Sequence, residues 1–272
     1  AYAGCALTPV QSLGTVNVLY RLGTEMLLRF PRVIDWATVD KECKWIPYLA
    51  PHLPLRVPEP VALGQPTDQY PCIWGIFRWI PGDLYLDVGV QDEADAACRV
   101  AAFVNALHAI PVPEQAPCAG RLPLKELDDS TREAMAAATE LPDHQRLERI
   151  WADCLQAQPW EGVRSWIHAD LLRTNLLVNH GRISAVLDFG SAGAGDPAHD
   201  LIPAWSLFGD KGRHVFRQQV RADADAWGRA RGYALHQAAL IIPYYRDTNP
   251  GFVSLAMQTM REILQDDEAA RN

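Results

Sequence analysis

The sequence feature that most constrains the fold is a pair of short apolar runs, residues 176–178 and 183–187, separated by a turn. The turn contains Asn179 and Gly181, residue types that suit the tight connection of a β-hairpin. Asn175 stands immediately before the first run and Asp188 immediately after the second. A hairpin brings these two positions together, so we expect their side-chain oxygens to converge.

This arrangement predicts a metal site. Mg²⁺ prefers one or two carboxylates, carbonyl oxygens and phosphate oxygens, and Asn175 and Asp188 offer the protein's share of such a shell. Asp170 precedes Asn175 on the same loop, close enough to accept a proton from an incoming hydroxyl. Each short motif, H-x-D at residues 168–170 or D-F-G at residues 188–190, would recur by chance in many chains. Their order and the thirteen-residue spacing from Asn175 to Asp188 make the combination specific evidence for a metal site beside a base.

The remaining sequence predicts an α+β fold with two lobes, residues 1–80 and 81–272, since a chain of 272 residues exceeds the usual size of one domain. The first lobe is expected to be small and rich in β-strands. The second is expected to be larger and mostly helical. Strands are predicted at residues 16–22, 26–30, 61–63, 73–80, 165–167, 176–178 and 183–187. Helices are predicted at residues 38–49, 92–109, 143–156, 197–208, 215–231 and 255–268, and Pro47 and Pro51 are expected to end the first of these.

Composition excludes several classes of protein. The net charge of −8 and the thin spread of Lys and Arg argue against nucleic acid as a partner, because binding to phosphate backbones needs a basic surface. The six cysteines form no C-x-x-C pair, which argues against a zinc or dithiol site. No apolar run is long enough to cross a membrane, and no signal peptide is recognised, so we expect a cytoplasmic protein without a membrane partner.

The motifs resemble those of the aminoglycoside phosphotransferase family of antibiotic kinases, which have a protein-kinase-like fold. The matching residues are His168, Asp170 and Asn175, then Asp188-Phe-Gly190, and then Gly195-Asp-Pro197 with Asp200. The resemblance implies that Asp170 is the catalytic base and that Asn175 and Asp188 are magnesium ligands. It also implies ATP or GTP as the phosphoryl donor, and a structural role for His168.

The resemblance extends to the first lobe, where it implies a nucleotide site. Residues 14–17, including Asn17, look like a short loop that covers phosphates. Arg29 stands where kinases carry a strand lysine and Glu42 where they carry its helical partner, although both could instead form a surface ion pair. Residues 77–82 look like the segment that binds adenine, with the carbonyl of Arg78 and the N–H of Ile80 as candidates.

The acceptor is expected to be a small hydroxylated molecule. Asp196 follows Asp188 by eight positions and no Ala-Pro-Glu follows, so the long activation segment of protein kinases is absent. Asp196 itself suits a helix N-cap and Asp200 a brace for the catalytic loop. The acidic net charge suits solubility and would also attract a polycationic acceptor. The resemblance implies an antibiotic as the acceptor, an aminoglycoside above others. The carboxylates available for such a substrate are Glu126, Asp128, Asp129, Glu133, Asp223, Asp225, Asp247, Glu262, Asp266 and Asp267.

Three alternatives remain at this point. The aromatic residues of the second lobe would also suit a macrolide or a cyclic peptide antibiotic. A kinase of the same fold could act on a metabolite such as an amino alcohol. A nucleotide-binding module without activity is the third alternative, against which the presence of Asp170, Asn175 and Asp188 argues.

Overall fold

The computed structural model describes residues 4–10, 16–32, 34 and 38–271, and the chain divides into two compact units. Unit 1 consists of Ala1–Val90 and Thr174–Gly190, and unit 2 of Gln91–Arg173 and Ser191–Asn272. Unit 1 is rich in strands and unit 2 is mostly helical, as predicted for this α+β, kinase-like fold class. Two segments beyond residue 80 belong to unit 1 by their packing. The division of functions between residues 1–80 and 81–272 stays a prediction.

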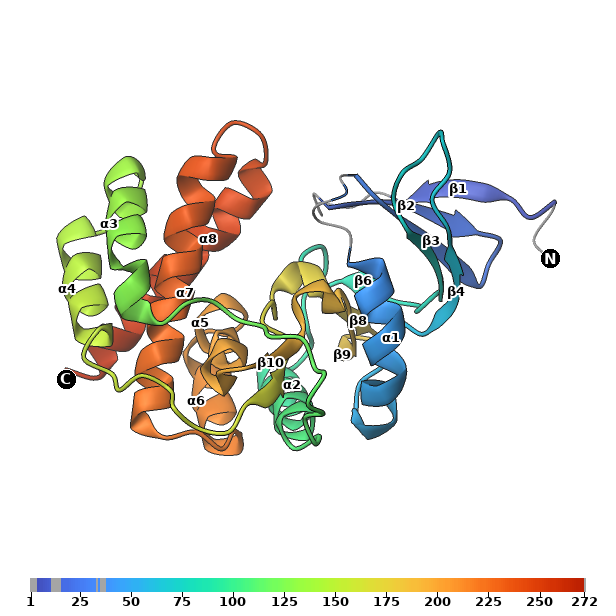
Figure 1. Cartoon of the computed structure of the whole chain (residues 1–272). Helices are drawn as coiled ribbons and strands as arrows, with labels where there is room; N and C mark the ends of the chain where they lie inside the picture. Colours follow the sequence, from blue (N-terminus) through green and yellow to red (C-terminus); the bar gives the residue numbers. More distant parts are fainter. Residues whose placement is uncertain (1–3, 11–15, 33, 35–37, 272) are drawn as a thin grey trace. The chain divides into compact units, whose positions relative to one another are not determined.

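Unit 1 is built on an antiparallel sheet with the strand order β1-β2-β3-β5-β4 (Figure 1). Its strands are β1 Leu7–Val10, β2 Asn17–Leu22, β3 Met26–Pro31, β4 Pro60–Gly64 and β5 Trp74–Arg78. The predicted hairpin around Gly23 is confirmed, with Asn17 opposite Pro31 and Leu22 opposite Met26. Gly23 has a φ of 59°, a conformation that glycine adopts without steric cost.

Helix α1 (Val39–Leu49) packs against the sheet through Val39, Ile46 and Leu49, which are all buried. The predicted helix at residues 38–49 is confirmed, although Pro47 lies inside its last turn and does not break it as expected. Proline removes only one backbone hydrogen bond here, in the last turn, and burial of the flanking Ile46 and Leu49 side chains offsets that loss.

The predicted hairpin of the 176–187 region is confirmed as part of a second sheet in unit 1, with the order β6-β8-β9. Its strands are β6 Asp83–Leu84, β8 Leu176–Asn179 and β9 Arg182–Val186. Leu176 lies opposite Val186, and the turn residues His180 and Gly181 both have positive φ values, of 50° and 72°. This hairpin fixes the positions of Asn175 and Asp188 within unit 1.

Unit 2 is organised around the long helix α7 (Ala224–Tyr245), which contacts α3, α4 and α8 (Figure 1). Its other helices are α2 Glu93–His108, α3 Asp128–Ala137, α4 His144–Cys154, α5 Pro203–Ser206, α6 Asp210–Gln219 and α8 Pro250–Ala269. Strand β7 (Ser165–Ile167) pairs with β10 (Gly193–Gly195). The core contains three fully buried tryptophans, Trp151, Trp166 and Trp205, so core packing is confirmed for these aromatic side chains.

Two predicted helices of unit 2 are wrong in extent. Residues 197–208 form a 3₁₀ helix, η6 Pro197–Leu201, followed by the short α5, because Pro203 lacks the N–H that a continuous helix needs. The predicted helix at residues 215–231 is two helices, since α6 ends at Gln219 and α7 starts at Ala224. Asp223 causes the new start, as its carboxylate accepts a hydrogen bond from the N–H of Ala226 at 2.7 Å. The sequence reading also missed helix α3.

No helix among the described residues combines the length and the apolar character that a membrane span requires.

Gly195 of β10 packs closely against the backbone of Ala119, and this close packing leads to a prediction on stability. A Cβ atom added at Gly195 would collide with the carbonyl oxygen of Ala119, a backbone atom that cannot move freely, and would lie 2.8 Å from Ile167 Cδ1. We expect Gly195→Ala to lower the free energy of unfolding of unit 2 by about 1–3 kcal/mol. Gly209→Ala is the matched control, because the nearest atom to its added Cβ is 3.5 Å away. Equal thermal unfolding midpoints of the two variants would contradict this packing.

Candidate functional site

Unit 1 contains one group of candidate residues, centred on an ion pair between Arg29 of β3 and Glu42 of α1. Arg29 Nη1 lies 2.7 Å from Glu42 Oε2, and the side chains are only 7% and 0% exposed. The hydroxyl of Thr38 donates a second hydrogen bond to Glu42, to Oε1 at 3.3 Å. The pair is therefore buried, and the alternative of a surface ion pair is wrong.

Arg29 also faces Asp188, which follows strand β9. Its Nη2 atom lies 3.5 Å from Asp188 Oδ1, so one guanidinium bridges two carboxylates. Burial by itself would lower the pKa of Arg29, but Glu42 and Asp188 raise it above its usual value. The Arg29 guanidinium therefore remains positively charged, and it lies beside the Asp188 carboxylate, which the sequence predicts to be a metal ligand.

The residues that fit a divalent cation are Asn175 and Asp188. The carbonyl of Asn175 accepts a hydrogen bond from the N–H of Leu187 at 2.8 Å, which holds the two ends of the hairpin side by side. Asp188 has a φ of 58°, a strained conformation for this residue type, and its side chain is 43% exposed. An exposed carboxylate beside a buried amide matches the oxygen ligands that Mg²⁺ prefers.

Lys41 is a residue of this region that the sequence reading missed. It lies on α1 in the electrostatic range of Glu42 and Asp188, and burial lowers the pKa of its amine. The only sequence signal was its position directly before Glu42, on a helix that follows the Arg29 strand. Arg29 and Lys41 together give unit 1 two cations near Asp188.

Three other predicted nucleotide residues lie on the main sheet or directly after it. Arg78 ends β5, and its exposed side chain pairs with Glu59 at 3.1 Å, which leaves only its backbone for a ligand. The N–H of Ile80 donates no hydrogen bond to any described residue. Asn17 begins β2, and its buried Oδ1 lacks a hydrogen-bond partner among the described residues. Gly14 and Thr15 of the predicted phosphate-covering loop lie outside the described residues.

Unit 2 contains a separate group of candidate residues, on and around the loop that carries Asp170. The carboxylate of Asp200 is completely buried and accepts hydrogen bonds from the N–H groups of His168, at 2.9 and 3.1 Å, and of Ala169, at 2.8 Å. His108 Nε2 lies 3.2 Å from the same carboxylate. Burial alone would raise the pKa of Asp200, but the hydrogen bond and charge of His108 lower it below its usual value. The predicted bracing role of Asp200 is confirmed.

The Asp170 side chain lies among polar groups of unit 2. Gln237 of α7 donates a hydrogen bond from Nε2 to Asp170 Oδ1 at 3.4 Å. Arg121, which the sequence reading missed, lies in the electrostatic range of Asp170, and burial lowers the pKa of its guanidinium. The same arginine lies near His199 and His236, and burial lowers the pKa of each of these histidines to about 4, so both are neutral at neutral pH.

Asp196 has the predicted structural role and one more. It caps η6 by accepting a hydrogen bond from the N–H of Ala198 at 3.0 Å. Its carboxylate also forms a buried, two-point ion pair with Arg229 of α7, at 2.8 and 3.2 Å. This pair ties the segment after β10 to the central helix and was not evident from the sequence, because 33 residues separate its members.

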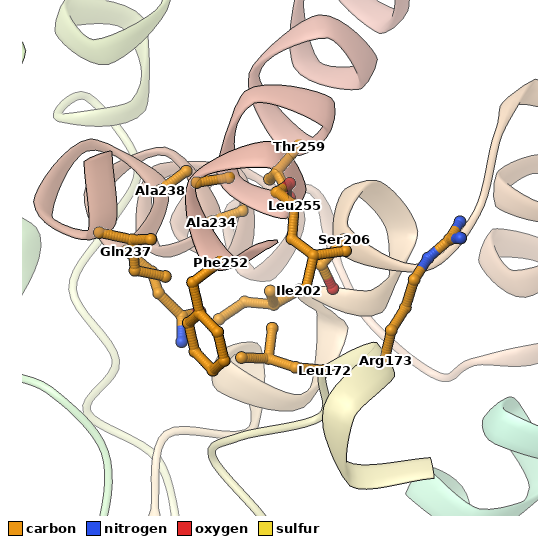
Figure 2. A pocket seen from close by; sticks show the side chains of 12 residues that line it. Leu172, Arg173, Ile202, Ser206, Ala234, Gln237, Ala238, Phe252, Leu255 and Thr259 are labelled. Atoms are coloured by element: carbon orange, nitrogen blue, oxygen red, sulfur yellow. Dashed lines mark hydrogen bonds between the residues drawn. The ribbon is translucent and has the colours of Figure 1, made fainter. Parts of the chain in front are cut away.

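A cavity opens beside Asp170 in unit 2, between the loop after it and helices α5, α7 and α8 (Figure 2). Gln237 lines this cavity and contacts Asp170, so the two features are adjacent. Most of the other lining residues are apolar.

The described residues contain no group of three or more His, Cys, Asp or Glu side chains that could hold a metal ion. A site made of Asn175 and Asp188 has only one such residue and would depend on phosphate oxygens and water for the rest of its shell.

A model described as the phosphotransferase enzyme family matches residues 10–233. A search of curated protein sequences finds no match.

Solved structures of similar fold include structures of aminoglycoside and macrolide phosphotransferases. The GDP complex of wild-type aminoglycoside 2'-phosphotransferase-IIIa is 19% identical, with a TM-score of 0.67, and the match covers 96% of this chain and 93% of that one. The GDP and kanamycin complex of APH(2")-IIia is 19% identical, with a TM-score of 0.69 and coverage of 96% and 93%. Macrolide 2'-phosphotransferase MphH from Brachybacterium faecium is 21% identical, with a TM-score of 0.60 and coverage of 94% of each chain. At these identities the likeness establishes the fold.

The burial of the Arg29–Glu42 pair predicts a large effect on stability. Glu42→Ala leaves a buried guanidinium with only Asp188 to balance it, and we expect a loss of about 3–5 kcal/mol in the free energy of unfolding of unit 1. Glu59→Ala removes an exposed partner of Arg78 and should cost less than about 1 kcal/mol. Chemical denaturation of both variants measures the difference. A loss for Glu42→Ala as small as that for Glu59→Ala would show that the pair is not buried in solution.

Proposed function

Because the chain belongs to the phosphotransferase enzyme family, we propose that it transfers the γ-phosphoryl group of a magnesium-bound nucleoside triphosphate to a hydroxyl group of an antibiotic. The observation that carries the proposal is the bridge of Arg29 between Glu42 and Asp188. It places a permanent cation beside a partly exposed carboxylate at the end of a hairpin whose other end is Asn175.

Asn175 and Asp188 are the proposed ligands of the magnesium ion. When bound, Mg²⁺ neutralises the negative charge of the phosphate oxygens. The protein contributes the Asp188 carboxylate and the Asn175 amide, and Arg29 fixes the Asp188 side chain from one side.

The proposed nucleotide-binding residues are Asn17, Arg29, Glu42, Arg78 and Ile80. Arg29 would contact phosphate oxygens while Glu42 holds its guanidinium in place. The carbonyl of Arg78 and the N–H of Ile80 would bind the purine base through the main chain. These assignments support ATP or GTP as the donor and residues 1–80 as the nucleotide-binding lobe.

Asp170 is the proposed catalytic base of the second lobe, residues 81–272. It accepts the proton of the acceptor hydroxyl as the oxygen forms a bond to the γ-phosphorus and the bond to the β-phosphate oxygen breaks. The hydrogen bonds of Asp200 to His168 and Ala169 hold the loop, and Gln237 orients the carboxylate. The nucleoside diphosphate is the leaving group.

The acceptor proposed from the sequence is an aminoglycoside, a cationic substrate, and its phosphorylation in the cytoplasm would confer resistance. The names of the relatives support an antibiotic acceptor, because they include enzymes for aminoglycosides and for macrolides. A macrolide is the second candidate, favoured by the apolar cavity beside Asp170.

The role of Asp170 predicts a specific loss of turnover. We expect Asp170→Ala to reduce phosphoryl transfer by a factor of about 10²–10⁴ and to leave the affinity for magnesium-nucleotide unchanged, since the base contacts the acceptor and not the phosphates. Radiolabelled phosphate transfer to a panel of aminoglycosides and macrolides measures the first effect and calorimetry the second. Asp153→Ala, which removes an exposed carboxylate of α4, is the control. Comparable turnover in both variants would end the assignment of Asp170.

The role of Asp188 predicts a different loss. Asp188→Ala should weaken binding of magnesium-nucleotide and leave binding of metal-free nucleotide nearly unchanged, because the carboxylate acts through the metal. Calorimetry with and without Mg²⁺ separates the two affinities. Equal magnesium-dependent affinity in the variant and the wild type would contradict the ligand role. Nucleotide binding without any transfer by the wild type would favour a binding module, and transfer to an amino alcohol alone a metabolic kinase.

A further inference from the structure

A single side chain, that of Gln237, connects the cavity in unit 2 with the proposed catalytic base, Asp170. Gln237 lines it and donates a hydrogen bond to Asp170, and Leu172, two positions after Asp170, forms another part of its wall (Figure 2). An acceptor whose hydroxyl reaches Asp170 would therefore place its neighbouring atoms at this cavity.

The wall of the cavity is apolar and partly open to solvent. Four large apolar side chains of the wall are only half-buried, so part of their surface faces solvent: Leu172, Ile241 of α7, and Phe252 and Leu255 of α8. The volume is about 30 Å³, which is room for a small alkyl group and not for a whole drug-sized molecule. When an apolar group of a ligand covers this exposed apolar surface, water is released from both surfaces and binding becomes more favourable.

The charges of the cavity do not suit a polyamine. Arg173 is the one charged side chain among its lining residues, and no carboxylate of the described chain lines it. Several of the carboxylates expected to bind a cationic acceptor are already neutralised within unit 2. Asp266 pairs with Arg217 at 2.8 Å, Asp267 with Arg146 at 3.0 Å, and Glu262 with Arg213 at 3.1 Å.

Arg121 is a second positive charge near Asp170, with which it interacts electrostatically. It forms no ion pair with a carboxylate within 4 Å among the described residues, and its main-chain N–H donates a hydrogen bond to His199 Nε2 at 2.8 Å. The charged and titratable groups near it are Asp170, Tyr233, His199 and His236. The guanidinium of Arg173 extends away from the cavity, where it donates a hydrogen bond to the carbonyl of Leu207 (Figure 2).

We propose that this cavity is a subsite for an alkyl branch of the acceptor, so that the acceptor carries apolar substituents next to the phosphorylated hydroxyl and is not a polyamine. The inference rests on the proposed phosphotransferase function, and it favours the second candidate acceptor, a macrolide, over the aminoglycoside proposed from the sequence. It assigns to Ile241, Phe252 and Leu255 the selection of the acceptor.

The test fills the cavity without touching the proposed catalytic residues. Ile241→Trp adds volume to a lining residue of α7, and Leu240→Trp is the matched control, because Leu240 is its neighbour on the same helix, is 40% exposed and does not line the cavity. Erythromycin, which is rich in methyl branches and carries one amine, and kanamycin, a polyamine, are the two probes. Calorimetry measures the affinity of the full chain for each, and thermal unfolding confirms that the variants fold.

We expect the wild type and Leu240→Trp to bind erythromycin equally and more tightly than kanamycin, and Ile241→Trp to bind it at least about tenfold more weakly. If Ile241→Trp does not fold, Phe252→Ala with Val253→Ala as its control replaces it, and the loss of the Phe252 wall should again weaken erythromycin binding. Tighter binding of kanamycin by the wild type, no binding of erythromycin, or equal erythromycin affinities of the cavity variant and its control would each overturn the subsite.

Phosphate transfer measured on the same samples separates the two proposals. Erythromycin that binds through the cavity and is not phosphorylated would contradict the phosphotransferase function and leave the subsite intact. Phosphorylation of either probe with binding that is insensitive to Ile241→Trp would contradict the subsite alone.

Discussion

The completely buried carboxylate of Asp200 determines the path of the loop on which the proposed chemistry of unit 2 depends. A buried charge is tolerated only when hydrogen bonds and opposite charges replace its water, and here the N–H groups of His168 and Ala169 and the ring of His108 do so. Accepting two consecutive N–H groups requires a sharp bend, and Ala169 has a φ of 64° as a result. Asp170 is the next residue along the chain. The buried Asp200 carboxylate therefore accounts for the positive φ of Ala169 and helps to set the path of the backbone at Asp170.

Unit 1 also contains a buried carboxylate, and there an arginine neutralises its charge. Glu42 is buried and is balanced by Arg29, whose second amino group reaches Asp188. Asp188 also has a positive φ, and in both units the strained residue lies at or beside the carboxylate that is proposed to act. Strain of this kind persists when the surrounding contacts outweigh it, which is what the buried ion pairs and the hairpin provide.

The parts of the structure that the sequence predicted are those set by local patterns. The hairpins around Gly23 and Gly181 follow from alternating strand residues and turn residues, and Asn175 and Asp188 follow from the second of them. Helix ends were harder, because Pro47 lies within α1 and Asp223 starts α7 through a side-chain hydrogen bond that competes with helical continuation. Residues such as Arg121 were missed, since their closeness to Asp170 depends on folding of segments far apart in the chain.

The net charge shows why composition was a weak guide to the acceptor. A charge of −8 describes the surface as a whole and predicts attraction of cations at a distance. Within unit 2 the balance is different, because arginines neutralise Asp266, Asp267, Glu262 and Asp196. Arg121, which interacts electrostatically with Asp170, adds a cation without such a partner among the described residues. Long-range attraction would raise the rate of encounter with a cationic molecule, but affinity depends on the groups that replace its water. Beside this carboxylate Gln237 donates a hydrogen bond, but the cavity that Gln237 lines is mostly aliphatic and aromatic, and that lining favours an acceptor with an apolar face.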